Sequence, residues 1–238
     1  MNRVPQKIGR KGSLRWMQSA VEHHGRELNE AISTVALTSS NIDWLSPLRS
    51  DGYAEYRDEG FLRLLGLDPA SLPLPLDRFW PANGPQWDAL GRTDRGELIL
   101  VEAKSHILEL NSVCTATNPK SLGLIKKSLD QTKAYLGVAE GFDWMRPFYQ
   151  YANRLAHLYY LSTINKVHAV LIFLYFLNDV EQDGPMTGRE WEAASSVVRM
   201  TLGLPKGRQQ RRVVNVFLDV SGWGGEVASK AVEANGRP

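Results

Sequence analysis

The chain has 238 residues, of which 43% are hydrophobic and 23% are charged, and these values are ordinary for a globular protein. A chain of this length can bury a full core. Its 28 basic and 26 acidic side chains leave a formal net charge of +2, which is too small to indicate a nucleic-acid partner by itself.

The cysteine content and the apolar runs exclude two further classes of protein. A single cysteine, Cys114, excludes an intrachain disulfide and a cysteine-rich zinc site, and it fits a reducing cytoplasm. The longest apolar run, residues 169–177, is too short to span a bilayer, and no apolar signal core follows the basic N-terminus. We therefore expect a soluble, cytoplasmic protein with no membrane partner.

The N-terminal part of the chain predicts an arm, a helix and an edge strand. Residues 1–12 are rich in cations and are expected to form a flexible basic arm. Ser13 is a suitable N-cap, and the apolar spacing after it predicts a helix over residues 13–35. Residues 41–48 predict a short edge strand that Pro47 ends.

The next segment predicts a second helix and the first core strand. Apolar spacing over residues 53–65 indicates a helix, and Gly66 is placed to end it. A proline-rich loop over residues 68–75 follows, and residues 76–80 are expected to form the first core strand.

Residues 98–104 read Leu-Ile-Leu-Val-Glu-Ala-Lys, so an apolar strand runs directly into an acid and a base. Residues 87–91 look like a second strand, and the Thr-Asp-Arg-Gly segment over residues 93–96 is a turn signal. Side chains on a strand alternate between its faces, so Glu102 and Lys104 should point the same way. Ile99, Val101 and Ala103 should then point to the other face.

Folding this hairpin about Arg95 sets Asp88 opposite Glu102, because the two positions lie equally far from that centre. Opposed side chains of an antiparallel pair share a face and lie about 5 Å apart at Cβ. Asp88, Glu102 and Lys104 should therefore converge at the edge of an apolar sheet. Two carboxylates and an ammonium in such a position predict a site for a divalent metal ion.

The C-terminal half alternates helices and strands. Asn118 and Pro119 are suited to open a helix that runs to residue 136, where Gly137 can stop it. The remaining expected elements are a helix over residues 147–164, a strand over 167–177, a helix over 187–202, a strand over 213–220 and a loose tail over 221–238. The order predicts an α/β fold with a mixed central β-sheet flanked by helices, in a single domain over residues 13–220.

The spacing of Asp88 and the Glu102-Ala103-Lys104 triplet resembles that of the PD-(D/E)XK nuclease superfamily. In that superfamily the Asp lies on one core strand and the (D/E)-x-K triplet on the next. Gln131 and Tyr135 on the following predicted helix are similar to the Gln-x-x-x-Tyr motif of the RecB-like branch. The resemblance covers about residues 50–180, and it implies a restriction-endonuclease-like core with an N-terminal helical extension.

The resemblance implies a Mg²⁺-dependent nuclease that hydrolyses phosphodiester bonds in DNA, with Mn²⁺ as an alternative ion. Asp88, Glu102 and the Ala103 carbonyl would bind the metal. An acid on the first core helix is a further ligand in many members. Glu55 and Glu59 both lie in the segment predicted as that helix, and the sequence does not select between them.

The same resemblance implies roles for the remaining motif residues. Lys104 would orient or help to deprotonate the attacking water, or steady the phosphate. Gln131 and Tyr135 would assist at the substrate, on the helical face that looks onto the metal in the RecB-like branch. Two positions depart from the pattern: Trp87 replaces the Pro of the motif, and His106 has no assigned role.

Residues outside the motif leave alternatives open. Gln150, Asn153, Arg154 and His157 form one polar stripe, which fits a solvated helix face as well as a groove wall facing a substrate. The residues expected to contact nucleic acid are Arg154, Lys206, Arg208, Arg211 and Arg212. A catalytically inactive binding module and a hydrolase of a phosphoester other than nucleic acid are the alternatives to a nuclease.

Overall fold

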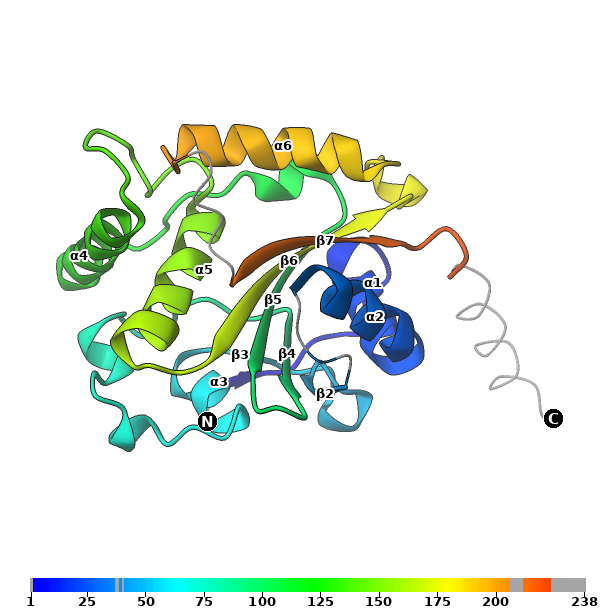
Figure 1. The fold of residues 1–238 in the computed structure, drawn as a ribbon, viewed down its shortest axis with the longest axis horizontal. Coiled ribbons are helices and arrows are strands. Elements are labelled where there is room, and N and C mark those ends of the chain that lie inside the picture. Colours follow the sequence, from blue (N-terminus) through cyan, green and yellow to red (C-terminus); the bar gives the residue numbers. More distant parts are fainter. Residues whose placement is uncertain (1, 37–38, 40, 206–211, 224–238) are drawn as a thin grey trace.

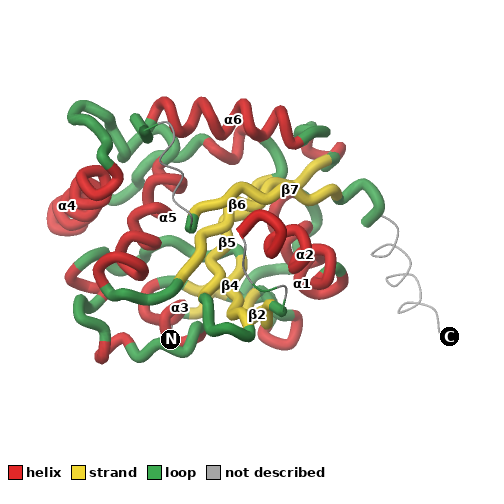
Figure 2. The backbone as a smooth tube through the Cα atoms, in the orientation of Figure 1, coloured by secondary structure: helices red, strands yellow, loops and turns green. Residues whose placement is uncertain are grey.

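A computed structural model describes residues 2–36, 39, 41–205 and 212–223 of the chain. A mixed sheet runs through the middle of the molecule with helices on both sides (Figures 1 and 2). The helices are α1 Gly12–His23, α2 Gly25–Ala36, α3 Asp58–Leu64, α4 Pro119–Leu136, α5 Tyr149–Tyr159 and α6 Gly188–Thr201. The strands are β1 Arg3–Val4, β2 Ile42–Ser46, β3 Glu55–Tyr56, β4 Ala89–Thr93, β5 Leu98–Lys104, β6 Ala169–Leu177 and β7 Val213–Asp219.

The main sheet has five strands in the order β2-β4-β5-β6-β7. Neighbours from β2 to β5 are antiparallel, whereas β5, β6 and β7 are parallel to one another. The parallel pairs need long crossovers, and these contain α4 and α5 between β5 and β6, and α6 between β6 and β7. The predicted α/β class, with a mixed sheet flanked by helices, is confirmed.

The β4–β5 hairpin has the predicted register. Ala89 pairs with Val101 and Arg92 pairs with Leu98, so the hairpin folds about Arg95 as expected. β4 begins two residues later than predicted, but the register is the same along its length. The position of Asp88 opposite Glu102 therefore follows from the hairpin as the sequence predicted it.

Alternate residues of β5 enter two separate cores, one on each face of the sheet. Leu98 and Leu100 pack in the core on the α4 and α5 side. Ile99, Val101 and Ala103 pack in the core on the α1 and α2 side, as predicted. Figure 1 shows α5 against one face of the sheet, α4 outside α5, and α1 and α2 on the opposite side. Glu102 and Lys104 share the alternation of Leu98 and Leu100, and so they face α5.

The N-terminal region differs from the expectation in three respects. The helix predicted over residues 13–35 is broken at His24, whose φ and ψ of −123° and 27° are not helical, and Gly25 then begins α2. The helix begins at Gly12, so Ser13 is not its cap. Residues 2–11 are not a free arm, because β1 pairs with β3 in a small second sheet.

Two further elements differ from their predictions. Gly52 and Tyr53 adopt positive φ values of 59° and 50°, which stop a helix from forming there, and the chain makes β3 before α3. The helix predicted over residues 53–65 is therefore only α3. The strand predicted over residues 76–80 is instead a single 3₁₀ turn over Leu76–Arg78. Phe79 and Trp80, which follow this turn, pack against the buried His157 and pair with no strand of the sheet.

The C-terminal half agrees with the expectation where the structure describes it. Asn118 caps α4 by accepting hydrogen bonds from Lys120 N and Ser121 N at 2.9 and 3.2 Å, and Gly137 ends the helix with a φ of 73°. α5 continues into a π-helical turn over Tyr160–Ile164. Of the tail predicted over residues 221–238, positions 224–238 lie outside the described residues. Among those described, no helix has both the length and the apolar character needed to cross a bilayer.

Candidate functional site

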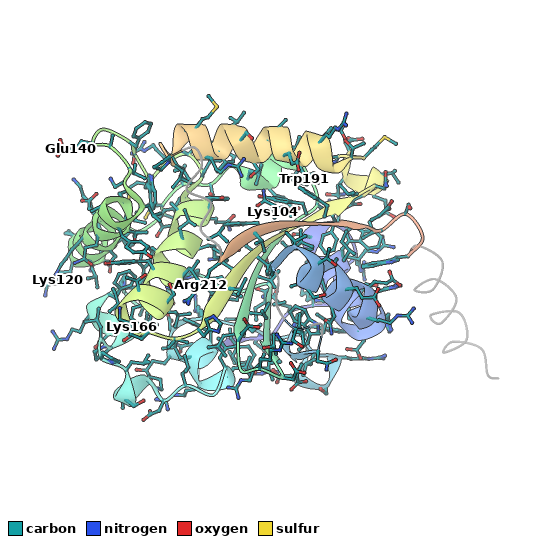
Figure 3. The ribbon with its side chains drawn as sticks, in the orientation of Figure 1. Lys104, Lys120, Glu140, Lys166, Trp191 and Arg212 are labelled. Carbon is teal, nitrogen blue, oxygen red and sulfur yellow. The ribbon has the colours of Figure 1, made fainter. Side chains whose placement is uncertain are left out.

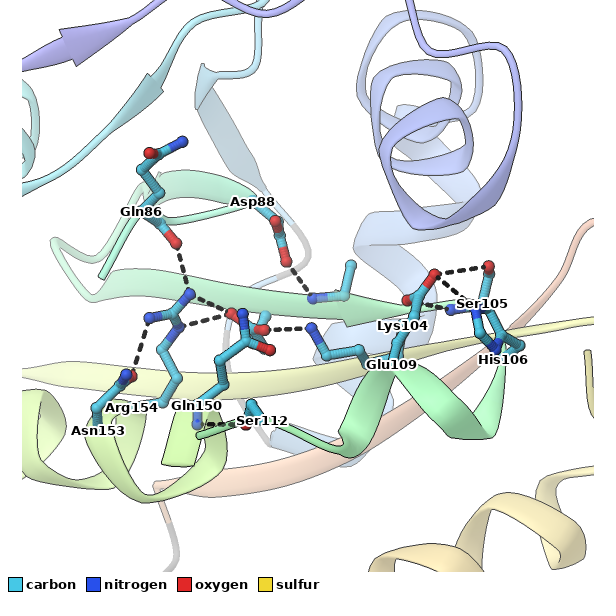
Figure 4. A network of polar contacts seen from close by, with 12 residues as sticks. Gln86, Asp88, Lys104, Ser105, His106, Glu109, Ser112, Gln150, Asn153 and Arg154 are labelled. Atoms are coloured by element: carbon cyan, nitrogen blue, oxygen red, sulfur yellow. Dashed lines mark hydrogen bonds and ion pairs between the residues drawn. The ribbon is translucent and has the colours of Figure 1, made fainter. Parts of the chain in front are cut away.

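The polar residues at the end of the β4–β5 hairpin meet as the sequence predicted. Asp88 precedes β4, and its Oδ2 accepts a hydrogen bond from Ala103 N at 2.7 Å (Figure 4). The N–H and C=O of one strand residue point to the same edge. The Ala103 carbonyl therefore lies on the Asp88 side of β5, where β4 has not yet begun.

Glu102 and Lys104 form a buried ion pair beside Asp88. Glu102 is 2% exposed and Lys104 is 8% exposed. Lys104 Nζ donates to Glu102 Oε1, and Arg154 Nε on α5 donates to Glu102 Oε2 at 2.6 Å (Figure 4). Each oxygen of Glu102 is thus held by a different cation. A carboxylate buried to this extent requires such partners.

Arg154 is the residue of this cluster that the sequence did not assign correctly. It is 3% exposed, so it does not form the exposed DNA contact that was predicted for it. Besides Glu102, its guanidinium donates to Asn153 Oδ1 at 3.0 Å and to the Gln86 carbonyl, and it lies over the Trp87 ring, 4.7 Å from its centre. These contacts fix the orientation of Arg154 and, through it, that of Glu102.

Glu55, and not Glu59, is the further acid of this cluster. Glu55 lies on β3, is 8% exposed, and its Oε2 accepts hydrogen bonds from Gln86 Nε2 at 2.8 Å and Gln6 Nε2 at 3.1 Å. Glu59 lies on α3 and pairs at the surface with Arg63 at 2.9 Å. Of the two acids that the sequence left open, Glu55 lies at this cluster and Glu59 does not.

The cluster holds three carboxylates, Asp88, Glu102 and Glu55, against two cations, Lys104 and Arg154. Burial and the neighbouring Glu102 raise the pKa of Asp88 to about 8. Burial also raises the pKa of Glu55, with a further contribution from Glu102, although the Gln86 hydrogen bond opposes it. The cluster therefore has an unfavourable excess of negative charge when all its acids are ionised.

The ion pair keeps its own members charged. Burial acts to raise the pKa of Glu102, but Arg154 and Lys104 together hold that pKa below its ordinary value. Burial likewise acts against the Lys104 ammonium, but Glu102 and Asp88 hold the pKa of Lys104 above its ordinary value. Lys104 is therefore a buried ammonium, ready to donate hydrogen bonds, and Glu102 is a carboxylate.

The donor set fits a hard divalent cation. Such an ion prefers carboxylate and carbonyl oxygens, and it would neutralise the excess negative charge that raises the pKa of Asp88. Within the described part of the chain, no three His, Cys, Asp or Glu side chains are arranged to hold a metal ion. The residues that would hold it are those that the sequence pattern predicted, the carboxylates of Asp88 and Glu102 with the Ala103 carbonyl, and the two oxygens of Glu102 here accept from Lys104 and Arg154.

Gln131 and Tyr135 are not brought to this cluster. Both are exposed on α4, which packs against α5 and not against the end of β5 (Figure 1). Tyr135 lies against Tyr159, with their ring centres 4.9 Å apart. The face of the helix after the hairpin therefore does not look onto Asp88. It is α5, through Arg154, that supplies a helical residue to the cluster.

The predicted nucleic-acid contacts do not form one surface in the described structure. Arg212 lines a groove of about 1520 Å³ with Tyr135, Tyr151 and Arg199, and none of Asp88, Glu102 or Lys104 lines it. Arg154 is buried, as described above. Lys206, Arg208 and Arg211 lie outside the described residues.

Comparison of the chain with protein-family models, with curated proteins and with solved structures gives no match. A function for this chain therefore has to be argued from the geometry of the cluster.

His106 lies beside the cluster, next to Glu109. Ser105 N donates to Glu109 Oε2 at 3.1 Å, and His106 Nε2 lies 3.6 Å from Glu109 Oε1 (Figure 4). Gly12, the first residue of α1, lies close to the same Glu109 carboxylate and to Ser105 Oγ. Glu109 thus connects the turn after β5 to the start of α1, and His106 lies beside this glutamate.

His157, the last residue of the polar stripe on α5, belongs to the core. Its ring is 1% exposed and lies edge-on to four aromatic rings, and its Nδ1 lies 2.8 Å from the Asn153 carbonyl oxygen. The four rings are Phe61, Phe79, Trp80 and Trp87. Burial lowers the pKa of His157 to about 3, so this residue is neutral and structural.

Replacing His157 with leucine is expected to weaken the acid sensitivity of the fold. The unfolded chain takes up a proton on this histidine below about pH 6.5, whereas the folded protein does so only near pH 3. Its contribution to stability is therefore complete above pH 6.5 and is lost as the pH falls towards 3. Between pH 6.5 and 5.5 the parent should lose about 1 kcal/mol more than the variant in urea unfolding.

Proposed function

We propose that this protein is a Mg²⁺-dependent nuclease of the PD-(D/E)XK type that hydrolyses phosphodiester bonds in DNA. The observation that carries the proposal is the convergence of Asp88 and Glu102, from the two arms of one hairpin, with Lys104 on the same face. The order of helix, hairpin, helix and parallel strand agrees with the core of that superfamily.

Hydrolysis adds the oxygen of a water molecule to phosphorus and breaks one ester P–O bond. Asp88, Glu102 and the Ala103 carbonyl would hold Mg²⁺, which supplies activation of water and neutralisation of charge on the phosphate. The Lys104 ammonium donates a hydrogen bond to Glu102. From this position it would orient the attacking water or contact a phosphate oxygen. Arg154 keeps Glu102 in place from the opposite side.

The unequal charges within the cluster support a functional reading over a structural one. A purely structural ion network would pair its buried carboxylates fully, because an uncompensated buried charge lowers stability. Asp88 instead accepts a backbone hydrogen bond and lies beside two other acids, Glu102 and Glu55, with Lys104 as a nearby cation that it shares with Glu102. Strongly perturbed acids of this kind concentrate at sites of catalysis and metal binding.

The proposal is tested by incubating the protein with linear and circular DNA, each single- and double-stranded, with Mg²⁺ or Mn²⁺. We expect cleavage of at least one of these substrates, and we expect EDTA to abolish it because the carboxylates would lose their metal. Cleavage of circular DNA would indicate internal cutting, and digestion of linear DNA alone would indicate action from ends. No cleavage of any substrate with either ion would contradict the proposal.

A second candidate, an inactive binding module with the same fold, is favoured by one observation. Both oxygens of Glu102 are already engaged by Lys104 and Arg154, as in an ion pair that only stabilises the structure. Titration calorimetry separates the two candidates, because only the nuclease requires Mg²⁺ or Mn²⁺ to bind. A hydrolase of another phosphoester would bind the metal yet show no salt-dependent binding of oligonucleotides.

A further inference from the structure

We propose that the segment over residues 5–11 binds the phosphate backbone of the nucleic-acid strand that enters the site, through Lys7, Arg10 and Lys11. This inference rests on the proposed function and extends it to a substrate-binding element. The segment was predicted only as a flexible arm. Its contacts place it instead alongside the carboxylate cluster.

The segment begins at the Glu55 side of the cluster. Val4 of β1 pairs with Glu55 of β3, and the Gln6 side chain donates to Glu55 Oε2 at 3.1 Å. Gln6 N also donates to the Gly52 carbonyl at 3.2 Å. The chain therefore leaves β1 in direct contact with an acid of the candidate site.

The segment ends beside Ser105, the residue that follows Lys104 at the end of β5. Gln18 on α1 holds its middle part, because its Oε1 accepts from Gly9 N at 2.8 Å and its Nε2 donates to the Lys7 carbonyl at 3.0 Å. The segment then enters α1 at Gly12, which lies against Ser105, the residue after Lys104. Residues 5–11 thus run from Glu55, an acid of the cluster, to the turn that follows β5.

The three cations on this segment are not used by the fold. Lys7, Arg10 and Lys11 are exposed and form no ion pair with any residue in the described parts of the chain. The neighbouring arginines behave differently, since Arg3 pairs with Asp51 at 2.7 Å and Arg15 pairs with Glu181 at 3.1 Å. Backbone and glutamine contacts hold the segment, while its cationic side chains remain available.

The position of Lys11 favours a functional reading. Lys11 occupies the N-cap of α1 without capping it, and the first turn of the helix contains no acid. A cation at the N-terminal end of a helix is unfavourable, because the helix dipole is positive there. The Glu109 carboxylate already lies beside the start of α1, whereas the exposed cations Lys7, Arg10 and Lys11 are free to attract a phosphate group. A polyanionic backbone is therefore the partner that this segment fits.

The test compares two variants with the same change in charge. The first, called the arm variant, replaces Lys7, Arg10 and Lys11 with glutamine. The second, called the α4 variant, replaces three exposed lysines of α4 with glutamine, namely Lys120, Lys126 and Lys127. Lys120 lies far from Lys104 in the molecule (Figure 3). Binding of fluorescent single- and double-stranded oligonucleotides is measured by anisotropy at several salt concentrations, in EDTA so that no cleavage occurs.

We expect the arm variant to bind at least about tenfold more weakly than the parent at low salt, with the slope of log affinity against log salt reduced by about 2 to 3. The α4 variant should bind nearly as the parent does. Neither variant should unfold at a lower temperature than the parent, because none of these six side chains forms an ion pair within the described residues, and loss of Lys11 removes a cation from the N-terminal end of α1. A double variant, Lys7→Gln with Arg10→Gln, leaves the start of α1 unchanged and should give an intermediate slope.

Three outcomes would overturn the inference. If the parent binds with a salt dependence that the arm variant retains, the segment does not contact phosphate, and the proposed nuclease is unaffected. If the α4 variant loses as much affinity as the arm variant, the effect is one of total charge. If the parent binds neither oligonucleotide, both proposals are contradicted: that nucleic acid is the substrate, and that residues 5–11 bind it.

Discussion

Replacing Lys104 with alanine is expected to lower the rate of DNA cleavage by about 10²- to 10⁴-fold, the range that a positioned proton-transfer or electrostatic group supplies. Lys104 Nζ is the donor that lies on the same face as Asp88 and Glu102, and its ammonium contacts Glu102 directly. In the proposed reaction, loss of this ammonium would leave the attacking water or the phosphate without its orienting donor. Initial rates on linear DNA with Mg²⁺ measure the effect.

Two controls separate this role from a loss of folding. Lys104→Met keeps most of the alkyl stem within the buried site, so it should lose cleavage to a similar extent while remaining folded by circular dichroism. Lys126→Ala removes an exposed lysine of α4 and should cleave at the parental rate. Cleavage by Lys104→Met at the rate of the parent would show that the ammonium has no part in the reaction.

Replacing Asp88 with asparagine is expected to stabilise the metal-free protein at neutral and alkaline pH while abolishing metal binding and cleavage. The pKa of Asp88 is raised to about 8 in the folded state, against 3.8 as its ordinary value. The folded state thus binds a proton that the unfolded chain has released, so the contribution of Asp88 is complete below pH 3.8 and is lost as the pH rises through 8. Asparagine does not titrate, and its side-chain oxygen can still accept from Ala103 N.

The advantage of Asp88→Asn should therefore grow between about pH 4 and about pH 8 and reach about 2 kcal/mol, as measured by urea unfolding in EDTA. Asp130→Asn is the matched control. Asp130 lies at the surface of α4 and pairs with Lys133, so its replacement should change the free energy of unfolding by less than about 0.5 kcal/mol at every pH. A variant at position 88 that is less stable than the parent at pH 8 would show that the carboxylate stabilises the fold.

The local sequence pattern was sufficient to predict the β4–β5 hairpin and most strands of the main sheet. The register about Arg95 followed from a turn flanked by two apolar runs, and the strand period of two then set Glu102 and Lys104 on one face. The two ends of α4 could also be predicted from the sequence, because Asn118 and Gly137 act on backbone groups a few residues away. Errors occurred where backbone conformation depended on distant contacts, as at β3, which pairs with β1 and, through Tyr56, with Trp87.

The alternation of β5, the opposition of Asp88 and Glu102 and the mixed α/β class could all be predicted from the amino-acid order, because each depends on periodicity and on short-range geometry. The folded molecule was needed to show that Arg154 lies beside Glu102, that Glu55 and not Glu59 joins the cluster, and that Gln131 and Tyr135 do not. Those choices depend on how α4 and α5 are placed against the sheet and on which face of each is buried. Helix packing is set by the shape of the whole core, and no local run of residues encodes it.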